Sequence, residues 1–103
     1  MRRVRVLEQA LALARARGWR VVGFAPPELP RYLRLLDTDP RIAPMWHEFL
    51  RLMPAIFHRY GLAWVSVEDA RTIPCTAADF PDAFHAGAAC SAKVRSKLDA
   101  AAP

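Results

Sequence analysis

The fold class rests on two short stretches, residues 19–24 (WRVVGF) and 62–67 (LAWVSV). Each is a continuous, mostly apolar run with β-branched residues, which is typical of a strand buried on both faces of a parallel sheet. Pro26 and Pro27 follow the first run, and proline cannot continue a central strand. Helical patterns flank and separate the two runs, so we expect parallel strands joined by right-handed crossovers, with helices on both faces.

Four segments carry the helical patterns. Residues 3–17 form an amphipathic pattern that ends at Gly18, and a shorter helix is expected to begin near Pro30. Residues 44–60 carry a wide apolar stripe, and residues 88–102 form the closing helix. The order is helix, strand, helix, helix, strand, loop, helix. Residues 1–103 therefore predict one partial α/β domain, part of a three-layer α/β/α (flavodoxin-like) fold with a short parallel sheet.

Two strands cannot complete such a sheet, because each keeps an open edge. We expect a further strand, a second chain or the remainder of a longer protein to complete it. A chain of 103 residues is too short for a TIM barrel. It is about the length expected for the second half of a doubly wound domain of ~200 residues.

The charge balance says little about partners. The net charge is +5, but thirteen of the fifteen cations are arginine and the chain has no asparagine, which is typical of GC-rich coding. An arginine cluster in the first segment could face nucleic acid, but the aromatic residues do not interleave with it, so we favour a solvated helix face and no nucleic-acid partner. This cluster comprises Arg2, Arg3, Arg5, Arg15, Arg17 and Arg20. No run is apolar enough to span a membrane, and no signal-peptide pattern is present.

The most informative segment is residues 80–87 (FPDAFHAG), just before the closing helix. Asp82 and His85 are three residues apart, a spacing that lets a carboxylate in a turn bind one imidazole nitrogen and leave the other free as a base. A loop at the carboxyl edge of a parallel sheet is where an α/β fold places its ligands. The alternative is that Asp82 caps a turn and His85 is an ordinary loop histidine.

Together with the order of elements, this segment resembles the C-terminal half of the SGNH/GDSL hydrolase superfamily, most closely a cell-envelope branch of O-acetylation proteins. The resemblance covers roughly residues 5 to 100. It implies that His85 is the general base, that Asp82 orients it, and that the substrate is an ester such as an O-acetyl group on a carbohydrate. It also points to a cell-envelope parent. We expect no cofactor. The family's nucleophilic serine and its oxyanion glycine and asparagine have no counterpart in this chain, which implies half of an active site that is inactive alone.

The cysteines and the other histidines suggest further candidate sites. Cys75 and Cys90 flank the Asp82–His85 segment and could form a disulfide, or Cys90 could be a buried thiol on the apolar stripe of the closing helix. A metal site built from these cysteines and His85 lacks a fourth ligand. His47 begins a motif like His-Glu-x-x-His, but Arg51 occupies the second ligand position, so His47 is interpreted as a helix surface residue, as is His58. We therefore predict no metal.

Two hypotheses follow. The chain is either the C-terminal portion of an SGNH-type ester hydrolase or O-acetyl transfer protein, or a non-catalytic α/β module that self-associates through an open sheet edge.

Overall fold

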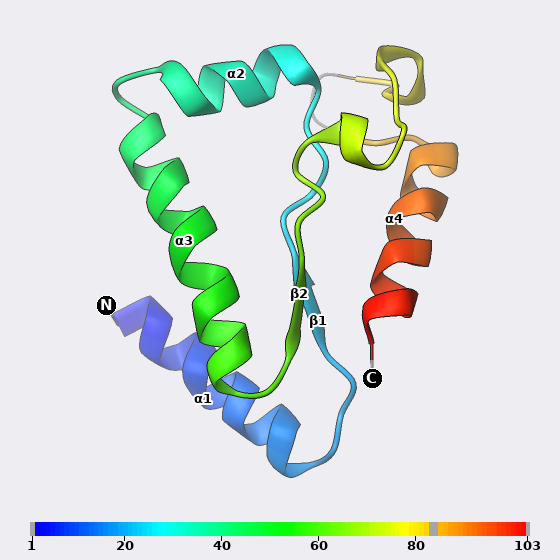
Figure 1. The fold of residues 1–103 in the computed structure, drawn as a ribbon. Helices are drawn as coiled ribbons and strands as arrows, with labels where there is room; N and C mark the ends of the chain where they lie inside the picture. The colour runs from blue at the N-terminus through cyan, green and yellow to red at the C-terminus, as the bar shows by residue number, and fades with distance from the viewer. Residues whose placement is uncertain (1, 83–84, 103) are drawn as a thin grey trace.

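The computed structural model describes residues 2–82 and 85–102. It combines helices with one short parallel sheet, in an order that confirms the predicted succession of elements (Figure 1). The helices are α1 (Arg2–Ala16), α2 (Pro30–Thr38), α3 (Ala43–Arg59) and α4 (Ala88–Ala101). The strands are β1 (Val22–Phe24) and β2 (Ala63–Val65), and two 3-10 turns, η1 (Ala70–Thr72) and η2 (Ala77–Asp79), precede α4.

The two strands run parallel with Gly23 opposite Trp64. A Cβ on Gly23 would lie 2.5 Å from Trp64 and 2.6 Å from Phe57, so glycine is required where β1 passes under these rings. Beyond the strands the two segments meet again, because Glu28 pairs with Asp69 in an isolated parallel bridge. The backbone N–H of Glu28 donates to the carbonyl of Glu68 at 2.8 Å. This second meeting fixes the loops at the carboxyl edge of the sheet.

The strands are shorter and more exposed than the sequence predicts. The prediction that both are buried on both faces is wrong: Phe24 is 37% exposed, and all three residues of β2 are only half-buried. The physical reason is that the described residues add no third strand to either edge, so each strand lacks a neighbour on one side. The shorter helix begins at Pro30 as predicted and continues to Thr38.

Two hydrophobic clusters hold the elements together, and successive residues of β2 face different ones. Trp64 packs against the first, which we call the α3 cluster, and Val65 packs against the second, the α4 cluster. The α3 cluster consists of Leu11, Ile56, Phe57 and Leu62. The α4 cluster consists of Leu29, Val67, Ala70, Ile73, Cys75, Phe80, Cys90 and Val94.

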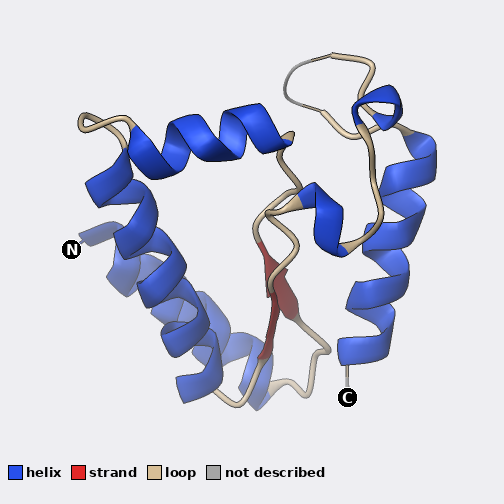
Figure 2. Ribbon diagram, turned by 45° about the horizontal axis from the view of Figure 1, so that its top comes forward, coloured by secondary structure: helices blue, strands red, loops and turns tan. Residues whose placement is uncertain are grey.

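The molecule is thin. Its extents are 41 × 33 × 18 Å, and its radius of gyration of 14.8 Å exceeds the ~13 Å typical of a compact chain of this length. Figure 2 shows α3 and α4 standing on opposite sides of the two strands, with α2 crossing from α3 toward the loops. The apolar stripe of α3 is buried only toward its C-terminal end: Ile56 is 1% exposed, whereas Met45 is 77% exposed.

Candidate active site

A closed loop between η2 and α4 carries the predicted site residues. Its base is formed at Asp79, whose carboxylate accepts hydrogen bonds from the backbone N–H of Thr76 at 2.7 Å and from the Thr76 hydroxyl at 3.3 Å. The carbonyl of Asp79 also accepts from the N–H of Gly87 at 2.7 Å. A Cβ on Gly87 would lie 2.8 Å from this carbonyl oxygen, so glycine permits the loop to close.

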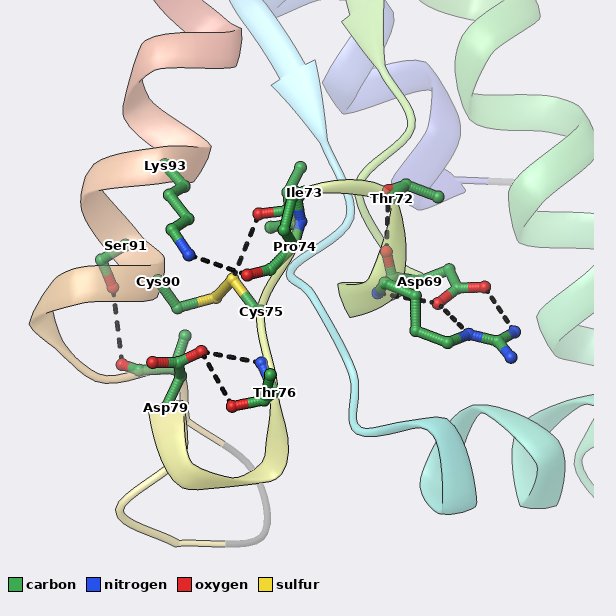
Figure 3. The surroundings of a disulfide bond; sticks show 12 residues. Asp69, Thr72, Ile73, Pro74, Cys75, Thr76, Asp79, Cys90, Ser91 and Lys93 are labelled. Carbon is green, nitrogen blue, oxygen red and sulfur yellow. Dashed lines mark hydrogen bonds and ion pairs between the residues drawn. A yellow bond between two sulfur atoms is a disulfide. The ribbon is translucent and has the colours of Figure 1, made fainter.

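A disulfide between Cys75 and Cys90 lies next to this base, on the side away from the loop (Figure 3). Both cysteines are buried, and their Cα atoms are 5.6 Å apart. The structure therefore settles the alternatives at these positions in favour of the disulfide. Nearby, the Lys93 ammonium donates to the carbonyl of Pro74 at 2.7 Å and joins α4 to the segment before the loop. The start and the end of the site loop are thus tied together covalently and by backbone hydrogen bonds.

Asp82 and His85 meet at the outer end of this loop. Both carboxylate oxygens of Asp82 lie 3.0 Å from Nδ1 of His85, and one of them also accepts the backbone N–H of His85 at 2.9 Å. The two side chains are exposed, His85 by 77% and Asp82 by 54%. Nε2 of His85 has no hydrogen-bond partner among residues 2–82 and 85–102. The pair thus has the arrangement in which a carboxylate orients an imidazole and leaves its second nitrogen to a substrate.

His85 also lines a hollow of about 540 Å³ between the end of β1 and α4. The strand side contributes Phe24 and Glu28, and the helix side contributes Ser91 and Arg95, all missed in the sequence because they come from separate elements with no shared motif. Burial raises the pKa of the Glu28 carboxyl above its ordinary value. Ser91 donates its hydroxyl to the carbonyl of Ala86 at 3.4 Å, at the first turn of α4.

The competing metal sites find no support. Cys75 and Cys90 are consumed by their disulfide, and the described part of the chain has no group of three potential ligands. Arg51 forms an ion pair with Glu48, so the segment that begins at His47 is a helix surface. His47 is exposed and places Nε2 3.2 Å from Asp37, while His58 is also exposed, as predicted for both.

The arginines of the first segment, apart from Arg2, whose side chain lies outside the described part, are exposed. Arg17 lies over the ring of Trp19, 5.4 Å from its centroid, and Arg20 donates to the carbonyl of Ala102 at 3.3 Å. These contacts are typical of a solvated surface; the prediction of no nucleic-acid partner stays a prediction.

Comparison with known proteins adds no further constraint: no protein family, curated protein or solved structure matches the chain. Among the described helices, none is both long and apolar enough to cross a membrane.

Proposed function

We propose that this chain is the C-terminal portion of an SGNH-type ester hydrolase or O-acetyl transfer protein and supplies the acid–base half of its site. The observation that carries the proposal is the contact of the Asp82 carboxylate with Nδ1 of His85 at 3.0 Å, at the outer end of a closed loop. The loop follows β2 of a parallel pair, at the edge where α/β folds bind ligands.

The chemistry follows from this contact. A serine hydroxyl from outside this chain attacks the ester carbonyl and transfers its proton to Nε2 of His85. Asp82 holds the ring through Nδ1 and stabilises the imidazolium that forms. His85 then returns the proton to the leaving alcohol, and the acyl group passes to water or to a second hydroxyl. A carbohydrate O-acyl ester is the substrate class that the family resemblance adds.

Two features of the fold support a missing half. Helices pack on both sides of β2, as in a three-layer α/β/α fold, yet the described residues supply only two strands. The molecule is also only 18 Å thick along its shortest axis. Further parallel strands, of which one would carry the nucleophile and the oxyanion donors, would complete the flavodoxin-like arrangement.

Reconstitution tests the proposal. The chain alone should hydrolyse p-nitrophenyl acetate no faster than its His85→Ala variant. Added to the polypeptide encoded upstream in the same reading frame, it should restore turnover that His85→Ala abolishes, and that polypeptide should contain a Gly-Asp-Ser element. Turnover by the isolated chain that needs His85 would overturn the assignment, and loss of that turnover in Ser91→Ala would place the nucleophile within the chain.

A second candidate function is self-association through an open sheet edge. It is favoured by the sheet edges, since no described residue adds a strand beside β1 or β2. A separate apolar hollow of about 430 Å³ lies away from the strands at the α2–α3 elbow, lined by Leu36, Ile42, Met45, Trp46 and Phe49. Light scattering distinguishes the two candidates: a stable dimer with no upstream Gly-Asp-Ser element favours the second, and a compact monomer removes it.

A further inference from the structure

The hollow beside His85 is polar at one end and apolar at the other. β1 ends at Phe24 and the chain continues in the same general direction to Glu28, whereas α4 runs the opposite way beside the strands, from Ser91 toward Leu98 (Figure 1). Because the two walls run in opposite directions, Glu28, Ser91 and His85 gather at the end next to the site loop. Phe24 and Leu98 gather at the far end.

The apolar end is formed by side chains from both walls. Val94 and Leu98 lie one turn apart on the face of α4 that also includes Ser91, and Phe24 faces them from β1. Phe24 is 37% exposed, so part of its ring remains available for contact. A hollow of about 540 Å³ lies within the size range of small-molecule sites, which are mostly apolar with a few polar groups that fix orientation.

We propose that this hollow binds the acyl chain of the ester, with the carbonyl at the His85 end and a chain longer than acetyl against Phe24, Val94 and Leu98. The inference rests on the proposed function, since it takes His85 as the end where the ester bond lies. Glu28 does not repel a neutral ester, but its carboxylate repels the acid product at the same end. Arg95 also lines the hollow, but its side chain is 84% exposed and lies 3.9 Å from the Asp99 carboxylate. The other polar side chains lie at the His85 end, and an acyl chain is the occupant that matches the apolar walls of Phe24, Val94 and Leu98 beyond them.

The hollow is accessible to measurement because the isolated chain is expected to bind esters without consuming them. Methyl acetate, methyl butyrate, methyl hexanoate and methyl octanoate are titrated against the chain, with the His85 ring signals followed by NMR. Affinity should rise about fourfold for each added methylene until the chain reaches the end of the hollow. The His85 signals should shift with every ester that binds.

Phe24→Ala and Phe49→Ala form a matched pair, because both residues are 37% exposed and Phe49 lies at the α2–α3 elbow, away from the hollow beside His85. Phe24→Ala should weaken methyl octanoate binding about tenfold, whereas Phe49→Ala should leave it unchanged. The inference is overturned if affinity is independent of chain length, if both variants weaken binding equally, or if the upstream polypeptide displaces the ester. These outcomes are separate from the proposed function, which fails if turnover by the reconstituted protein is indifferent to His85 or if the isolated chain shows turnover that needs His85.

Discussion

The α3 and α4 clusters lie on different sides of β2 and are built differently. The α3 cluster joins residues far apart in the chain, from Leu11 in α1 to Ile56 and Phe57 in α3, without a covalent link. Its rings meet edge to face, with the centroids of Phe57 and Trp64 5.3 Å apart. The α4 cluster draws mainly on the segment from Val67 to Val94 and contains the disulfide.

This difference indicates which cluster holds the site loop in its conformation. The loop of Asp82 and His85 leaves and re-enters the α4 cluster, whose segments are near neighbours in sequence and are closed by Cys75–Cys90. The α3 cluster instead packs α1 and α3 against the sheet, and the apolar stripe of α3 beyond it becomes exposed toward Met45. We therefore expect substitutions in the α3 cluster to lower global stability, and substitutions in the α4 cluster to act first on the site loop.

The largest expected effect belongs to the α3 cluster. Ile56→Ala should lower the free energy of unfolding by about 3 kcal/mol, because Ile56 is 1% exposed and its truncation leaves a cavity. Met45→Ala, on the same helix but at a side chain 77% exposed, should change it by less than about 0.5 kcal/mol. Urea denaturation measures both; similar losses in the two variants would mean that the stripe of α3 is covered along its whole length.

Removing the disulfide should act on the other region. Cys75→Ala combined with Cys90→Ala should cost about 3 kcal/mol, since the bond closes a loop of 15 residues. Amide hydrogen exchange should accelerate mainly over residues 76–89, with little change in α1 and α3 below the global unfolding transition. Equal acceleration in both clusters would contradict the separation of the two regions.

Two glycine substitutions compare the α3 cluster with the base of the site loop. Gly23→Ala places a Cβ against Trp64 and Phe57 in the α3 cluster, and Gly87→Ala places one against the carbonyl of Asp79 at the base of the site loop. Each should cost about 1–3 kcal/mol. Only Gly87→Ala should shift the NMR signals of His85; a comparable shift in Gly23→Ala would show that the loop is not ordered locally.

The smallest expected effects come from opposite titrations at the bridge between Glu28 and Asp69. The hydrogen bond from Arg71 lowers the pKa of Asp69, so this carboxylate stabilises the fold above its unfolded pKa and loses that effect as the pH falls. Burial raises the pKa of Glu28, so its effect is present below its unfolded pKa and is lost as the pH rises.

Asp69→Asn should therefore lower stability at pH 7 by about 0.5–1 kcal/mol and have little effect at pH 3. Glu28→Gln should raise stability at pH 7, by less than about 1 kcal/mol, with little effect at pH 3. Urea denaturation at pH 7 and pH 3 measures the free energy of unfolding of both variants and of the wild type. A loss of stability in Glu28→Gln at pH 7 would show that the Glu28 carboxylate has a favourable partner.

The sequence predicts the order of elements well, because each has a local cause. Gly18 and Gly61, both with positive φ, follow helices at the predicted positions, and Pro26 follows the first strand. The Asp82–His85 contact was predictable for the same reason, since three residues of spacing suffice to form it. Their catalytic role stays a prediction.

What the sequence could not predict depends on contacts between distant segments or on chemistry outside the chain. The exposure of Phe24 follows from the absence of a neighbouring strand among the described residues, which an apolar run does not reveal. The hollow of Glu28, Ser91 and His85 requires β1 and α4 to be side by side. The state of Cys75 and Cys90 depends on redox conditions that spacing alone does not encode.

The claim that Asp82 prepares His85 to act as a base is tested most directly by ¹⁵N NMR of the imidazole, on the wild-type chain and on Asp82→Asn. For the neutral ring we predict that Nδ1 carries the proton and Nε2 is bare in the wild type, and that this preference is lost in Asp82→Asn. A wild-type ring with its proton on Nε2, or a tautomer that Asp82→Asn leaves unchanged, would contradict the account.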